Sequence, residues 1–258
     1  MMEVLTNPGA ADALGTLLAY LSRTAPAIMM IAATFVFLRP AKHVRVLLYL
    51  LTFVLLRDAL TPLSLWRFGV TEGVPWIRFF PSHLFLAGMA LSSLIAVVLL
   101  VLLDRENSRD VLFIRKGQAL QGWLAALSGL AVLLAPFLIL YQRVGIPERG
   151  GGVDSRWLGS ILAFALMGNL LEELLFRGYV YNLLRKKDPD LRAGVATGFV
   201  FCLCHVFLAT TVTPVGAPLL LFTLWEGVIC GIVGARYGVL PATLVHGGGI
   251  FVLASGVW

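Results

Sequence analysis

The chain has 258 residues, of which 59% are hydrophobic and 13% are charged, and its mean hydropathy is +0.90. A soluble domain of this length does not reach such values, so the composition excludes a soluble globular protein and indicates several membrane spans. The formal net charge is +6. Because the basic residues gather in short polar stretches between apolar runs, we attribute this charge to membrane topology and expect no nucleic-acid partner.

The spacing of the apolar runs predicts an all-α membrane protein, a polytopic bundle of about eight transmembrane helices. Residues 1–24 are mildly amphipathic and are expected to lie at the membrane interface. A motif-free region, 1–156, holds four spans, and a candidate catalytic core, 157–258, holds the other four. In chain order the predicted spans cover residues 25–38, 44–56, 83–103, 119–141, 157–184, 192–209, 217–235 and 239–258.

The distribution of Lys and Arg predicts the orientation in the membrane. The loops after the first, third, fifth and seventh spans hold twelve basic residues, and the opposite side holds seven that are interleaved with acids. By the positive-inside rule the twelve face the cytoplasm, which puts both termini outside. The predicted location is an integral position in a plasma membrane, bacterial or archaeal.

The fifth predicted span contains three ionisable side chains, Glu172, Glu173 and Arg177, inside a run that is otherwise apolar. Ionisable groups near the middle of a bilayer cost several kcal/mol unless they are paired, so they mark a site by default. A purely structural buried ion pair is the alternative interpretation.

Three further polar residues lie inside later spans, namely His205, Glu226 and His246. Counted inward from the cytoplasmic loops at 1.5 Å per residue, they and the glutamate pair fall between roughly 10 and 20 Å deep. Four helices therefore present acids and imidazoles in one layer.

The spacing in the fifth span predicts different roles for its two acids. Glu173 and Arg177 are four residues apart in the orientation that favours a helical ion pair. Glu172 is rotated by about 100° and needs another partner, for which His205 or His246 across the bundle is the candidate. A carboxylate beside an imidazole can take a proton from water near neutral pH, which is the chemistry of hydrolysis.

The pattern Glu172-Glu173-x-x-x-Arg177, then Phe201-x-x-x-His205, then a histidine on the last span resembles the CPBP family of intramembrane proteases. This family includes CAAX prenyl endopeptidases and bacteriocin-processing relatives. The resemblance covers residues 157–258, and the first four spans carry no motif.

The resemblance implies that Glu172 and His205 activate the water, that Glu173 and Arg177 support the site, and that His246 helps to stabilise the oxyanion. The family continues His-x-x-x-Asn, whereas this chain has Ile250 at the last position. Two substitutes for that asparagine are open, namely the side chain of Asn169 and the backbone N–H groups of the run that starts at Gly247.

Other features keep more than one interpretation. Glu226 fits no motif and could recognise substrate, take part in a proton-linked step, or be a carboxyl held neutral by its apolar surroundings. Gly227, Gly231, Gly234 and the run 247–249 are typical of close helix packing.

We expect no cofactor, with zinc as the alternative, held by Glu172, His205 and His246 around an open position for water. The expected partners are the lipid bilayer and a membrane protein or lipopeptide substrate, such as a lipidated peptide or a C-terminal sorting tail. The alternative function is a non-catalytic membrane scaffold or a proton-coupled transporter that uses the intramembrane Glu and His residues. A transporter of that kind should show symmetry between the halves of the chain, and none is visible.

Overall fold

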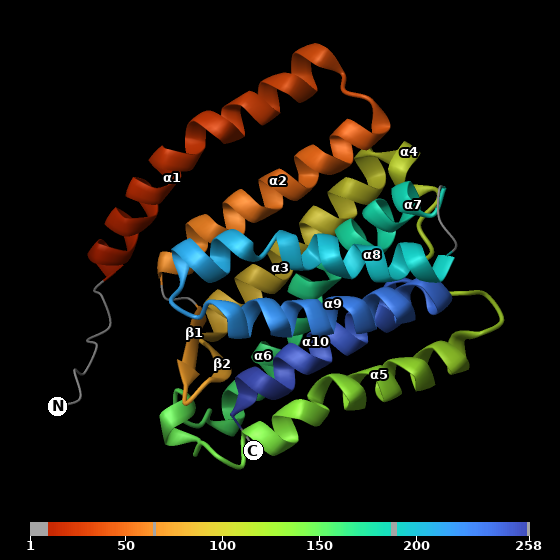
Figure 1. Ribbon diagram of the computed structural model, residues 1–258. Coiled ribbons are helices and arrows are strands. Elements are labelled where there is room, and N and C mark those ends of the chain that lie inside the picture. The colour runs from red at the N-terminus through yellow and green to blue at the C-terminus, as the bar shows by residue number, and fades with distance from the viewer. Residues whose placement is uncertain (1–9, 64–65, 187–189, 257–258) are drawn as a thin grey trace. The chain divides into compact units, whose positions relative to one another are not determined.

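The computed structural model describes residues 10–63, 66–186 and 190–256 (Figure 1). By packing, the chain forms two compact units, Met1–Trp66 and Arg67–Trp258. The motifs predict a separate, functional division at residue 156, between the motif-free region and the candidate catalytic core. That division stays a prediction.

The first unit is a pair of long helices. The first helix, α1 (Ala10–Ala33), continues as a π-helical turn, Thr34–Leu38, and ends at Arg39, whose backbone is left-handed with φ of 46°. The second helix, α2 (Lys42–Leu60), runs into a short 3₁₀ turn, Thr61–Leu63. Residues 10–24, which were expected to lie at the membrane interface, therefore belong to helix α1. Residues 1–9 of that stretch lie outside the described part of the chain.

A β-hairpin that has no counterpart among the predicted elements precedes the helices of the second unit. Strands β1 (Trp66–Thr71) and β2 (Val74–Phe79) pair through a two-residue turn at Glu72 and Gly73, with φ of 51° and 78°. Positive φ at both central residues is the geometry of the type I′ hairpin turn, which glycine makes possible.

The remaining helices of the second unit form a bundle in which segments far apart in sequence lie side by side. Helix α10 packs against α6, α5 and α9, and α8 packs along α9 (Figure 1). Two π-helical segments, Leu174–Val180 and Leu208–Val212, interrupt this regular structure. The helices are α3 (His83–Leu103), α4 (Arg105–Ser108), α5 (Ala119–Leu140), α6 (Leu158–Glu173), α7 (Tyr181–Leu184), α8 (Asp190–Leu203), α9 (Ala217–Tyr237) and α10 (Val239–Ser255).

The predicted all-α, polytopic membrane fold is confirmed. Among the described residues, six helical stretches are long and apolar enough to cross a membrane, and α10 is a shorter apolar helix of 17 residues. The remaining predicted span, α2, has 19 residues but carries charges near both ends, including Lys42, Arg45 and Asp58. Six of the eight predicted spans are therefore candidate spans by length and composition among the described residues. The other two predicted spans are also helices, but α10 is shorter and α2 is more polar.

Glycine pairs bring α8 and α9 into backbone contact, as the sequence predicted for Gly227 and Gly231. A Cβ atom on Gly198 would lie 2.6 Å from the carbonyl carbon of Gly227, and one on Gly194 would lie 2.5 Å from the oxygen of Gly231. Such distances leave no room for any side chain, so the two helices touch through their backbones.

Candidate active site

The site begins at the end of α6, where the α-helix widens into the π-helical segment Leu174–Val180. Glu173 is the last residue of α6, and Arg177 lies within the π-helical segment. The Arg177 Nη1 atom donates to Oε1 of Glu173 at 2.9 Å, and both side chains are at most 1% exposed. The predicted ion pair is confirmed. The π-helical distortion, which often marks functional sites, was not predicted.

Arg177 also connects this helix to α9. Its Nη2 atom donates to the backbone oxygen of Gly227 at 2.8 Å. The stem of the arginine passes beside Gly234, where a Cβ would lie 2.8 Å from the Arg177 Cγ atom. The planar guanidinium therefore spans two acceptors on two elements, a geometry that suits arginine and not lysine.

His246 approaches the same carboxylate from α10. Its Nδ1 atom lies 2.8 Å from Oε1 of Glu173, and the residue is 3% exposed. A carboxylate that already accepts from Arg177 accepts from His246 as well, so Nδ1 of the ring carries a proton. The other ring nitrogen, Nε2, faces Oε2 of Glu226 at 3.4 Å.

His205 lies just past the end of α8, where the regular helix stops at Leu203. Its backbone N–H donates to the oxygen of Cys202, three residues earlier, and its Nδ1 atom donates to the oxygen of Phe201 at 2.8 Å. Because a carbonyl oxygen only accepts, Nδ1 carries a proton and Nε2 is the basic nitrogen of the neutral ring. This tautomer suits an imidazole that accepts a proton.

The ring of Phe201 connects the histidines with the arginine. It lies 4.4 Å from the ring of His205 and 5.4 Å from that of His246, and the Arg177 guanidinium carbon lies 4.9 Å from its centre. The sequence contained Phe201 in the second motif but assigned no role to it. Its spacing of four residues before His205 was the available signal, since that spacing puts the two on one helix face.

Glu172 is half-buried beside Glu173. As the neighbour of Glu173 in the last turn of α6, it adds a second acidic side chain at that end of the helix. That Glu172 shares a water with His205 stays a prediction.

Asn169 and Gly247 are the two candidates to replace the family asparagine that is missing here, and each lies within a helix. Asn169 Nδ2 donates to the oxygen of Ala165 at 2.6 Å. Gly247 lies in regular α-helix, and a Cβ on it would be 2.8 Å from that same oxygen on α6. The glycine run thus serves close packing of α10, and a role for either residue at an oxyanion stays a prediction.

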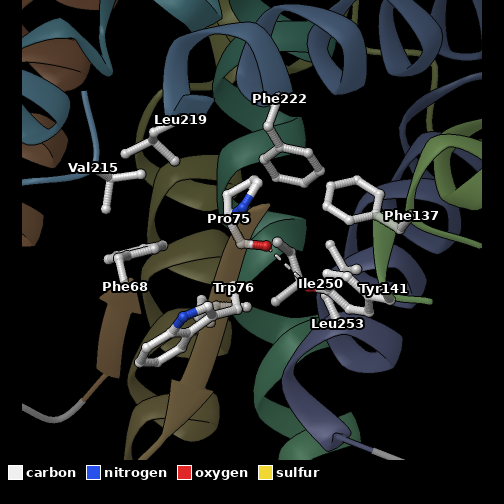
Figure 2. A pocket seen from close by; sticks show the side chains of 11 residues that line it. Phe68, Pro75, Trp76, Phe137, Tyr141, Val215, Leu219, Phe222, Ile250 and Leu253 are labelled. Atoms are coloured by element: carbon white, nitrogen blue, oxygen red, sulfur yellow. Dashed lines mark hydrogen bonds between the residues drawn. The ribbon is translucent and has the colours of Figure 1, made fainter. Parts of the chain in front are cut away.

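Ile250, one turn after His246 on α10, faces an apolar pocket (Figure 2). The hairpin forms one wall, where the Tyr141 hydroxyl donates to the oxygen of Pro75 at 3.1 Å. The position that the family fills with asparagine is therefore in apolar surroundings. The other side chains that line the pocket are those of Phe68, Trp76, Ile77, Phe137, Val215, Leu219, Phe222 and Leu253.

The residues of the zinc alternative do not form a metal-binding group. Across the described part of the chain, no three His, Cys, Asp or Glu side chains are clustered as metal ligands. The ring nitrogens of His246 are directed at the carboxylates of Glu173 and Glu226, and Arg177 supplies a positive charge next to them.

Comparisons with known proteins give one family match. No curated protein and no solved structure matches the chain. Residues 154–251 match the family described as Rce1-like, type II CAAX prenyl endopeptidase Rce1-like. The matched stretch contains Glu172, Glu173, Arg177, His205 and His246. Residues 154–251 of this integral membrane protein are thus similar to the Rce1-like type II CAAX prenyl endopeptidases, a family of proteases.

Proposed function

We propose that this protein hydrolyses a peptide bond in a membrane-associated protein or lipopeptide, either a lipidated peptide or a C-terminal sorting tail. The observation that carries the proposal is the buried contact set in which Glu173 accepts from both Arg177 and His246. His205 lies against the ring of Phe201, and the ring of His246 contacts that same phenyl ring. Burying charged and imidazole groups among apolar helices costs free energy, and clusters of this kind are typical of functional sites.

In the proposed reaction Glu172 and His205 activate a water. The water oxygen attacks the carbonyl carbon of the scissile bond while its proton moves to the Glu172 carboxylate. The oxyanion that forms is stabilised by an N–H group of His246. The bond between carbon and nitrogen then breaks, and the leaving nitrogen takes the proton from Glu172. Glu173 and Arg177 hold His246 in place throughout.

The site is proposed to open toward the cytoplasmic half of a bacterial or archaeal plasma membrane, with both termini outside. Support comes from the excess of basic residues in the loops after the first, third, fifth and seventh predicted spans. One of those residues, Lys187, lies outside the described residues.

The decisive experiment compares Glu172→Gln and His205→Gln with wild type in proteoliposomes, using a fluorogenic farnesylated peptide that ends in Cys-aliphatic-aliphatic-X. Loss of general-base catalysis should lower kcat by about 100-fold or more in each variant. His83→Gln is the matched control, because His83 lies at the start of α3 and bonds the Ser160 hydroxyl on the surface. Cleavage that persists in both site variants would show that the protease mechanism is wrong.

Metal dependence is tested on the same preparation. We propose that water activation needs no metal, so activity should survive strong chelation. Activity that is lost on chelation and restored by zinc would instead support the alternative in which Glu172, His205 and His246 bind the ion.

A further inference from the structure

Glu226 is a buried carboxyl whose burial is not explained by packing. It lies on α9, is 1% exposed, and its Oε1 atom has no hydrogen-bond partner within the part of the chain that the structure describes. A carboxyl in such surroundings is costly, and an apolar side chain of similar size would fill the same space at lower cost. Its other oxygen, Oε2, faces Nε2 of His246 at 3.4 Å.

The His246 ring thus has a carboxylate at each nitrogen. Glu173 on α6 holds Nδ1 at 2.8 Å, and Glu226 on α9 faces Nε2. An imidazole that is restrained at one nitrogen alone can still swing about that contact. Restraint at both nitrogens, from two different helices, leaves the ring one orientation.

Helix α10 itself offers little polar support to this ring. One turn before His246 lies buried Ala242, and one turn after it Ile250 faces the apolar pocket. The hydroxyl of Thr243, three residues earlier, donates to the oxygen of Val239 within the helix. Orientation of His246 therefore depends on the neighbouring helices.

We propose that Glu226 is a positioning residue that fixes the His246 imidazole from its Nε2 side, opposite Glu173. The catalytic consequence rests on the proposed function, in which His246 stabilises the oxyanion. The 3.4 Å separation exceeds the roughly 2.7–3.2 Å of a full N–H···O hydrogen bond. When the ring is an imidazolium, with a proton on each nitrogen, the N–H at Nε2 therefore retains the capacity to donate to a second acceptor.

The first arm of the test needs no substrate. The full chain, labelled with ¹⁵N-histidine in detergent micelles, contains four histidines, and the His246 signals are assigned by their loss in His246→Gln. We expect Glu226→Leu to shift the His246 Nε2 signal, and Glu226→Gln, which keeps the shape and an acceptor oxygen, to shift it less. Thr223→Val is the matched control, since Thr223 is buried one turn earlier on α9 and its hydroxyl donates to the oxygen of Leu220 within that helix. A His246 spectrum that is identical in wild type and Glu226→Leu would overturn the proposal.

The second arm measures cleavage of the farnesylated peptide. Misplacement of a reacting group by about 1 Å can cost about 100-fold, so Glu226→Leu should lower kcat by about that factor with KM changed less than about twofold. Glu226→Gln should recover most of the lost kcat, and Thr223→Val should cleave as wild type does. A Glu226→Leu protein with wild-type kcat would overturn the proposal. If wild type fails to cleave the peptide while the His246 signal still responds to Glu226→Leu, the proposed function fails and the positioning role stands.

Discussion

Arg177 is the residue on which most contacts of the site converge. Its two terminal nitrogens donate to Glu173 and Gly227, and its guanidinium lies over Phe201. Lysine offers a compact charge without the planar fork, so Arg177→Lys cannot reproduce both hydrogen bonds.

We therefore expect Arg177→Lys to fold but to lose about 10-fold to 100-fold in kcat, because Glu173 and His246 lose part of their support. Arg177→Met leaves the Glu173 carboxylate buried without its charged partner, which should destabilise the protein by about 3–5 kcal/mol. Thermal unfolding in detergent and peptide cleavage measure the two effects. Arg156→Lys, whose side chain is 67% exposed, is the control, and equal stability of Arg177→Met and wild type would contradict this account.

At the residue scale, the Glu173–Arg177 ion pair could be predicted from the sequence because residues four apart on one helix lie next to each other. The contact of His246 with Glu226 could not be predicted, since those side chains come from different helices. Nothing in the sequence states how two helices are rotated about their axes.

At the scale of elements, the backbone contact between α8 and α9 sets the position of His205 relative to Arg177 and Glu226. The contact depends on glycines at facing positions, such as Gly194 and Gly231. Because backbone atoms lie directly opposite, added volume can be accommodated only by moving one helix away from the other.

Gly231→Ala should therefore destabilise the protein by about 1–3 kcal/mol and lower kcat by displacing α8. Gly159→Ala is the matched control, since a Cβ at this exposed position in α6 meets nothing within 4 Å. Unfolding temperatures and cleavage rates of the two variants make the comparison. A Gly231→Ala protein as stable and active as the control would refute the packing argument.

The hairpin is connected to the end of α10 by Arg78. This buried side chain donates from Nε to the oxygen of Gly151 and from Nη1 to the oxygen of Leu253, in the last turn of α10. Burial lowers the pKa of the Arg78 guanidinium from its ordinary value, yet arginine stays charged at physiological pH. A cation at the carboxyl end of a helix also interacts favourably with the helix dipole.

Replacing Arg78 by methionine removes the donor to the buried oxygen of Leu253 and to the partly buried oxygen of Gly151, so we expect a loss of about 1–3 kcal/mol in stability. Arg67→Met, on the exposed side of β1, should leave stability nearly unchanged. Thermal unfolding in detergent distinguishes the two. Equal unfolding temperatures for both variants would show that Arg78 does not hold the end of α10.

At the scale of the whole molecule, the predicted orientation can be tested by labelling. In a background with Cys202, Cys204 and Cys230 replaced by alanine, Lys116→Cys should be shielded from an impermeant maleimide added outside intact cells. Arg143→Cys should react with it, because the loop after α5 is predicted to face outward. Both positions are exposed, and peptide cleavage by the background protein checks that it still folds. Labelling of Lys116→Cys from outside would show that the protein has the opposite orientation to the predicted one.

By itself the sequence determined the membrane class, the order of the helices and the residue types of the candidate site. Composition, apolar run length and residue spacing act locally, and they require no knowledge of how helices face one another. The bounds of α3, His83–Leu103, agree with the predicted 83–103 for this reason.

Only the tertiary structure decided which polar groups touch. It paired the two nitrogens of His246 with Glu173 and Glu226, set Phe201 between the histidines and Arg177, and put Ile250 in an apolar pocket. It also formed the β-hairpin and the π-helical segment at Arg177. The side-chain contacts depend on helix rotation and long-range packing, where one residue's position is set by partners tens of residues away and no local pattern records it.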